Sequence, residues 1–160
     1  MKIIYSIRDL PNKPSIYALY SGHATGEYVV YVGVAKKLRQ RVEQHLIKHD
    51  SSVTTGQSAV KLETRFLSKV KWWEEPGFSI RARLEAAELV ASELLKPVLV
   101  SRGNPRNDSR ELLNNKVFYE SMKRLIGNPS GELILLTFEE RIKLLDDRIA
   151  RLEEKMRNQN

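Results

Sequence analysis

The sequence predicts an α+β fold of the α/β-sandwich-like kind: a small mixed or antiparallel central sheet flanked by helices, with a C-terminal helix that bears a short heptad pattern. Two apolar, aromatic runs near the N-terminus are separated by turn-forming residues, which is typical of a β-hairpin. Two segments with helical periodicity follow them, and a regular 4-3 apolar spacing ends the chain. With 160 residues and 41% hydrophobic side chains, the chain can bury a core of its own.

The hairpin is predicted from residues 14–20 and 27–32. The first run, Pro-Ser-Ile-Tyr-Ala-Leu-Tyr, follows a Pro-Asn-Lys-Pro turn, and the second reads Glu-Tyr-Val-Val-Tyr-Val. Residues 21–26 between them are rich in Gly, Ser and Thr, which favour turns. The two runs are therefore expected to pair as neighbouring antiparallel strands.

Helices are predicted over residues 35–48 and 80–95, because apolar residues recur there every three or four positions. Pro97 ends the second helix, since proline cannot continue it. Between the two helices, residues 70–73 are expected to form a strand and residues 74–77 a turn.

A polar stretch at residues 101–110 predicts a boundary between a main domain at 1–110 and a helical extension at 111–160. Within the extension, residues 111–126 predict a helix and residues 133–136 a short strand.

The last segment carries apolar residues at spacings of 4, 3, 4, 3 and 4, which is a heptad pattern. They are Phe138, Ile142, Leu145, Ile149, Leu152 and Met156. Two interpretations are open: the helix packs on its own domain, or residues 138–156 form a homodimer as a short coiled coil.

The formal net charge of +7 lies entirely in the first 110 residues. Residues 1–110 hold 18 Lys and Arg against 11 Asp and Glu, whereas residues 111–160 hold 9 of each. A basic domain attracts polyanions, nucleic acid above all. The chain has no cysteine and no apolar run long enough to span a membrane, so we expect a soluble cytoplasmic protein.

Side chains able to act on a phosphate lie on the predicted hairpin and on the helix that follows it. Tyr17 and Tyr31 lie on its two strands, and Gly33 allows a sharp turn afterwards. Arg41 and His45 are four residues apart, so they share one face of the next helix. The start of this helix is basic, with Lys36, Lys37, Arg39 and Arg41. Positive charge there opposes the helix dipole, which favours an anionic partner.

This pattern resembles the GIY-YIG nuclease superfamily over residues 13 to 100. Ser15-Ile16-Tyr17 and Tyr31-Val32-Gly33 stand for the two triplets of its name. Arg41 follows Tyr31 by ten residues, as the family's helical arginine does, and His45 lies one turn further on. Glu88 precedes the helix-ending Pro97 by nine residues, which is the family's spacing for a metal-binding glutamate.

The resemblance implies metal-assisted hydrolysis of DNA, duplex or branched, with Tyr17, Tyr31, Arg41, His45 and Glu88 as the catalytic set. Tyr31, as a phenolate favoured by nearby positive charge, would activate water, and Arg41 would bind the scissile phosphate. Glu88 would hold one Mg²⁺ or Mn²⁺. His45 would orient or donate a proton, and Tyr17 would hydrogen-bond within the site.

The sequence departs from the family at three positions, and the first is Ser15, which replaces the first glycine of the name motif. Val34 stands where several members have lysine, and Val100 stands where an asparagine is usual. Asn104 and Asn107 are the two alternatives for that asparagine. These departures leave open a second function, a non-catalytic nucleic-acid-binding module on a GIY-YIG scaffold.

Nucleic-acid contacts are expected from three basic and four hydroxyl side chains: Lys36, Lys37, Arg39, Ser51, Ser52, Thr54 and Thr55. Lysine, arginine, serine and threonine commonly contact phosphates. The alternative for residues 50–60 is a turn-rich loop whose hydroxyl groups bond to its own backbone.

Overall fold

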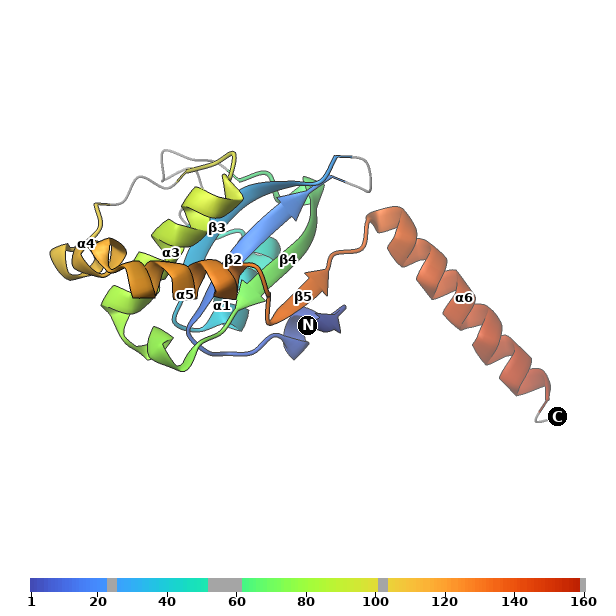
Figure 1. Cartoon of the computed structure of the whole chain (residues 1–160). Coiled ribbons are helices and arrows are strands. Elements are labelled where there is room, and N and C mark those ends of the chain that lie inside the picture. Colours follow the sequence, from blue (N-terminus) through green and yellow to red (C-terminus); the bar gives the residue numbers. More distant parts are fainter. Residues whose placement is uncertain (23–25, 52–61, 101–103, 159–160) are drawn as a thin grey trace.

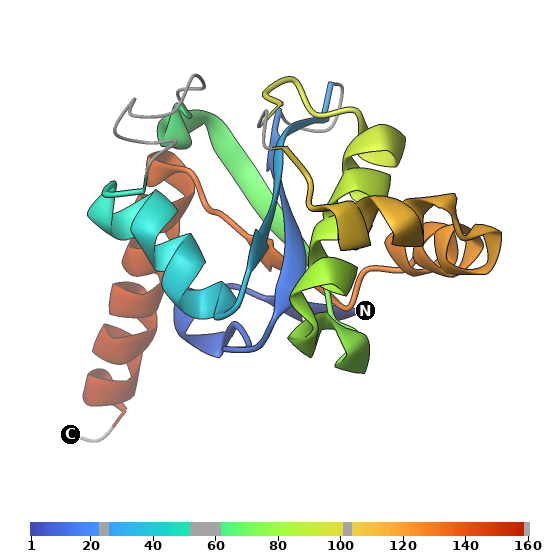
Figure 2. The same ribbon diagram turned by 90° about the vertical axis from the view of Figure 1, so that its left-hand side faces the viewer.

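The computed structural model describes residues 1–22, 26–51, 62–100 and 104–158. A five-stranded sheet with the order β1-β5-β4-β2-β3 forms its centre, and helices cover both faces (Figures 1 and 2). The strands are β1 (Lys2–Ile4), β2 (Ser15–Ser21), β3 (Tyr28–Ala35), β4 (Leu67–Trp73) and β5 (Gly131–Ile134). One pair is parallel and three are antiparallel, so the predicted α+β class with a mixed sheet is confirmed.

The predicted hairpin is present as β2 and β3, which pair antiparallel with Tyr17 opposite Gly33 and Leu19 opposite Tyr31. Strand β2 lies between β3 and β4, and β3 forms one edge of the sheet. Strand β5 pairs with β4 and β1. The sheet therefore crosses the division expected at residue 110, because β5 comes from the C-terminal part of the sequence.

One face of the sheet is covered by α3 (Arg81–Leu95), α4 (Asn107–Asn114) and α5 (Lys116–Ile126). The other carries α1 (Leu38–Glu43), which continues as a π-helical turn, η2 (Gln44–Lys48). Figure 2 shows the sheet between these two layers. Short 3₁₀ turns are η1 (Ile7–Asp9), η3 (Thr64–Phe66) and η4 (Pro76–Ser79).

The single helix expected at 111–126 is two helices, divided at Asn115. The Asn115 side-chain oxygen accepts hydrogen bonds from the backbone amides of Val117 and Phe118, at 3.0 and 3.1 Å. An asparagine in this role caps a new helix start. The side-chain cap thus outweighs the continuous helical periodicity.

Two apolar cores form because side chains alternate across the strands. Tyr17, Leu19 and Tyr31 face the α1 layer, whereas Ile16, Ala18 and Val32 face α3 and α5. Both candidate tyrosines, Tyr17 and Tyr31, therefore lie on the face of the sheet that α1 covers.

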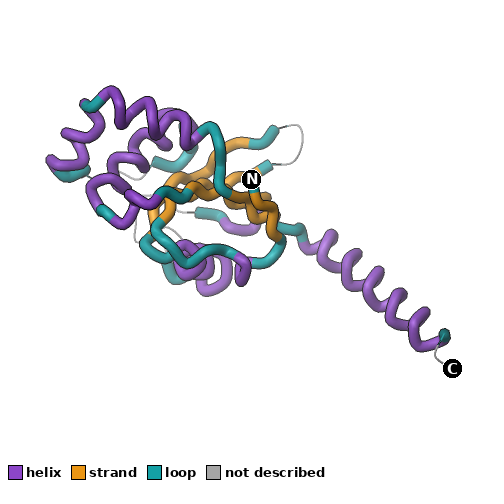
Figure 3. The backbone as a smooth tube through the Cα atoms, turned by 60° about the horizontal axis from the view of Figure 1, so that its bottom comes forward, coloured by secondary structure: helices purple, strands orange, loops and turns teal. Residues whose placement is uncertain are grey.

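The C-terminal helix α6 (Phe138–Arg157) starts with a capping box made by Thr137 and Glu140. It projects away from the rest of the molecule in two views (Figures 1 and 3). No helix in the described part of the chain is long and apolar enough to cross a membrane.

Candidate active site

The candidate site lies at the β3 edge of the sheet. The backbone amides of Val98 and Leu99 donate hydrogen bonds to the carbonyls of Val29 and Val30, at 3.0 and 2.9 Å, and Leu99 forms an isolated parallel bridge with Tyr31. The segment after α3 therefore covers the first half of this edge. Among the described residues, the second half, residues 32–35, has no strand partner on its outer side.

Tyr17, Tyr31 and His45 form a cluster of rings on the α1 side of this edge. The Tyr17 hydroxyl lies 2.7 Å from His45 Nε2. The Tyr31 ring centroid is 6.1 Å from that of Tyr17 and 6.2 Å from that of His45. Gly33 makes room for this cluster, since a Cβ there would lie 2.7 Å from both the Tyr17 hydroxyl oxygen and Tyr31 Cε1. Three residues predicted from the sequence are thus brought together.

His45 is held from both sides, because its Nδ1 lies 2.7 Å from the Ser51 hydroxyl. Burial, and secondarily the positive charge of Arg41, lowers the pKa of His45 to about 4. The imidazole is therefore neutral near pH 7, with one ring nitrogen donating and the other accepting. Ser51, expected to contact nucleic acid, is buried at 3% exposure and engages His45 instead.

Burial and nearby charge in this structure act against the phenolate form of Tyr31 that the sequence led us to expect. Burial and then the negative charge of Glu88 raise its pKa above the usual value, and these effects outweigh the opposing charge of Arg41. Burial is also the main reason why the pKa of Tyr17 is raised well above 10.0. The sequence shows the nearby cations but not how deeply the phenol groups are buried.

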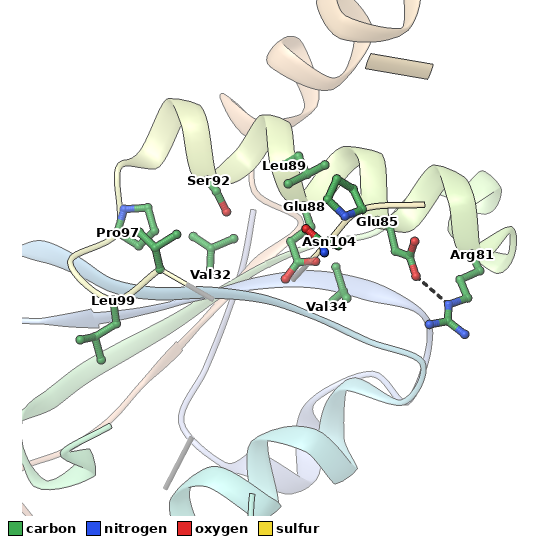
Figure 4. Close-up of a pocket in the computed structure, with 12 residues that line it drawn as sticks. Val32, Val34, Arg81, Glu85, Glu88, Leu89, Ser92, Pro97, Leu99 and Asn104 are labelled. Carbon is green, nitrogen blue, oxygen red and sulfur yellow. Dashed lines mark hydrogen bonds and ion pairs between the residues drawn. The ribbon is translucent and has the colours of Figure 1, made fainter. Parts of the chain in front are cut away.

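Glu88 reaches the same edge from α3, on the opposite side of the sheet. It lines a cavity of about 290 Å³ together with Val34, Glu85 and Asn104, and Figure 4 shows the Asn104 side chain beside Glu88. Burial, followed by the charge of Glu85, raises the pKa of Glu88 to about 7, against the lowering effect of Arg41.

The cavity distinguishes the two asparagines left open by the sequence. Asn104 lines it, whereas Asn107 is the first residue of α4 and is not among the lining residues. Val34 and Val100 also line the cavity, so both departures from the family pattern add apolar surface beside Glu88.

Arg41 lies on α1, at a neighbouring depression that it lines with Lys36, Lys37 and Arg81. Its guanidinium makes a long hydrogen bond of 3.4 Å to Gln44. Among the described residues, no carboxylate lies within 4.0 Å of it. Its charge is therefore available to an anion.

The other basic residues of this helix separate into two groups. Lys36 and Lys37 are exposed beside Arg41. Arg39 donates hydrogen bonds from Nε and Nη2 to the Leu10 carbonyl, at 3.0 and 2.9 Å. Its guanidinium thus anchors the helix to the N-terminal segment.

A single hydrated divalent cation fits the oxygen groups around Glu88. The described residues contain no cluster of three or more His, Cys, Asp or Glu side chains that could hold a metal by themselves. Mg²⁺, however, commonly binds one or two carboxylates and keeps several waters. Glu85 is engaged through Oε1 by Arg81 and through Oε2 by Ser109, which leaves Glu88 as the carboxylate and Asn104 as a neutral oxygen donor.

Sequence reasoning missed Glu85 and the link between His45 and Ser51. Glu85 precedes Glu88 by three residues, so helical spacing could have placed both on one face. His45 lies in the π-helical turn and Ser51 lies just beyond it, and apolar periodicity does not reveal such a turn. Ser52, Thr54 and Thr55 lie outside the described residues. Comparisons with protein-family models, curated proteins and solved structures found no match to this chain.

Proposed function

We propose that this protein is a metal-dependent endonuclease that hydrolyses phosphodiester bonds in DNA, either duplex or branched. The observation that carries the proposal is the convergence of Tyr31, Arg41 and Glu88 at one sheet edge. They come from β3, α1 and α3, yet Arg41 and Glu88 both act electrostatically on Tyr31, and Arg41 acts on Glu88.

Arg41 is the group proposed to bind the scissile phosphate. Its guanidinium is permanently charged and presents a planar fork that matches phosphate oxygens. The absence of a carboxylate within 4.0 Å, among the described residues, supports this role. Lys36 and Lys37 add positive charge beside it and would contact neighbouring phosphates.

Glu88 and Asn104 are proposed to hold the cation, Mg²⁺ or Mn²⁺. When bound, such an ion supplies charge stabilisation for the leaving oxygen. Because the negative charge of Glu88 raises the pKa of Tyr31, a positive charge next to Glu88 would offset that effect. Tyr31 would then lose its hydroxyl proton to solvent more readily, and the phenolate so formed would accept a proton from the attacking water. The neutral pair of Tyr17 and His45 would hold the Tyr31 ring in place.

Nicking of a supercoiled plasmid in Mg²⁺ or Mn²⁺ tests the proposal. We expect wild type to nick the plasmid, and Glu88→Gln and Arg41→Met to lose at least about 100-fold in rate, the size of effect seen when one group that stabilises transition-state charge is removed. Two exposed residues give matched controls: Glu93→Gln on the same helix as Glu88, and Arg110→Met on α4. Equal cleavage by wild type and both site variants would refute the proposal.

A second function, nucleic-acid binding without cleavage, is favoured by one specific observation. Val32, Val34, Leu99 and Val100 give the cavity beside Glu88 a largely apolar wall. This alternative expects binding to DNA that weakens as salt is raised, because phosphate contacts release counterions. It also expects the same absence of cleavage in wild type and in Glu88→Gln.

A further inference from the structure

The apolar stripe of α6 is uncovered in the monomer. Five of its residues are 43 to 67% exposed: Ile142, Leu145, Ile149, Leu152 and Met156. Helix α6 follows β5 in the chain and extends away from the sheet and the helices packed on it, which together form the body of the molecule (Figures 1 and 3). Of the two interpretations open from the sequence, packing on its own domain is therefore not what the structure shows.

The apolar residues have the identities that favour a two-stranded parallel coiled coil. With the spacing 4-3-4-3-4, heptad position a falls on Ile142, Ile149 and Met156, and position d on Phe138, Leu145 and Leu152. A β-branched residue at a combined with leucine at d favours dimers over trimers or tetramers.

The charges beside the stripe determine the direction of pairing. Every position e, just after d, is acidic: Glu139, Asp146 and Glu153. Every position g, just before a, is basic: Arg141, Arg148 and Lys155. In a parallel pair, each g residue faces the e residue five positions further along the partner helix. Arg141 would therefore meet the partner's Asp146, and Arg148 would meet the partner's Glu153, and both contacts join opposite charges. In an antiparallel pair, g faces g and e faces e, and every contact would join like charges.

From this pattern we infer that the protein forms a homodimer through α6, and that the two copies of the helix run parallel. The partner is a second copy of this chain, because the charge pattern complements itself. Both bodies would then lie at the same end of the coiled coil, since each joins α6 at its N-terminus. An antiparallel pair would instead separate the two ends by the ~30 Å length of a 20-residue helix.

The pattern covers only about three heptads, so the dimer is expected to dissociate on dilution. Sedimentation of the full chain across a wide range of concentrations should show a shift between 18.5 kDa and twice that mass. Neighbouring leucines provide a matched pair of variants. Leu145→Glu, in the stripe, should leave only monomer, whereas Leu144→Glu, equally exposed but at position c, should still dimerise.

Both leucines are more than half exposed on a helix outside the two cores, so the variants should remain folded, which circular dichroism checks. A monomeric mass at every concentration would overturn the inference. A trimeric mass, or a dimer that Leu145→Glu leaves intact, would also overturn it.

The direction of pairing can be tested by disulfide trapping, because the chain contains no cysteine. In a parallel dimer, Met156→Cys at position a places two thiols in the same layer, and mild oxidation should link most of the dimer. Glu154→Cys at position f, on the outer surface, controls for random collision and should link little. Equal linking of the two variants would overturn the parallel arrangement. This test does not depend on the proposed nuclease activity.

Discussion

Replacing Gly33 with alanine tests whether the two tyrosine rings pack as described. A Cβ at this position would lie 2.7 Å from the Tyr17 hydroxyl oxygen, 2.7 Å from Tyr31 Cε1 and 2.9 Å from Tyr17 Cζ. Ordinary contacts begin at 3.4 Å, so both rings would have to shift. The Tyr17 ring cannot move without straining its hydrogen bond to His45.

The expected loss of stability is the difference between two effects. Overpacking a buried site costs about 1–3 kcal/mol, while replacing glycine by alanine within a strand recovers about 0.5–1 kcal/mol. A net loss of about 1–2 kcal/mol remains, and at about 2–4 °C per kcal/mol for a chain of this length the Tm should fall by about 2–8 °C.

Thermal unfolding of Gly33→Ala and of a control, Gly127→Ala, measures this loss. Gly127 has a φ of −65°, and the nearest atom to a Cβ there would be the Arg124 carbonyl oxygen at 3.5 Å. The control should be neutral or gain about 0.4–1 kcal/mol, because alanine restricts the unfolded chain. If Gly33→Ala melts at or above the wild-type temperature, the tyrosine rings do not fill the space over Gly33.

Two further predictions concern the buried polar groups. Tyr17→Phe leaves His45 Nε2 without its 2.7 Å partner, so urea unfolding at neutral pH should show a loss of about 1–3 kcal/mol in the free energy of unfolding. The control Tyr28→Phe, at a 50% exposed position, should change that free energy by less than about 0.5 kcal/mol. Equal losses in the two variants would contradict the buried hydrogen bond. Folding raises the pKa of Glu88 from 4.5 to about 7. Between these two pH values the Glu88 carboxyl binds a proton more fully in the folded state than in the unfolded state, so the wild type loses stability as the pH rises through this range. Glu88→Gln should therefore gain stability relative to wild type between about pH 5 and pH 8, and a difference that stays constant with pH would contradict the raised pKa.

The contribution of His45 to folding stability changes with pH in the opposite direction to that of Glu88. Its pKa is lowered from 6.5 to about 4 on folding, so the unfolded state binds more protons in this window and stability rises with pH. The contributions of His45 and Glu88 partly cancel in wild type. Unfolding of Glu88→Gln should consequently show a steeper rise in stability between about pH 4.5 and pH 6.5 than wild type does.

The sequence predicted the hairpin, the helix that follows it and the long helix before Pro97, because these depend on local periodicity and turn residues. It did not predict β1, a strand of only three residues. It also placed a domain boundary at residue 110, although β5 lies inside the sheet. A run of three or four residues carries too little alternation to show which strand it pairs with. The pairing of segments that lie far apart in the sequence depends instead on the whole fold.

The residue types of the candidate site and the charge pattern of α6 were fixed by the amino-acid order alone. Only the tertiary structure brought Glu88, on one side of β3, close enough for its charge to act on Tyr31 and for the charge of Arg41 to act on both groups. Folding also buries Tyr31, which raises its pKa, and places the Ser51 hydroxyl 2.7 Å from His45 Nδ1. The physical reason is that ionisation depends on burial and on charges brought close by folding, neither of which spacing along the chain specifies.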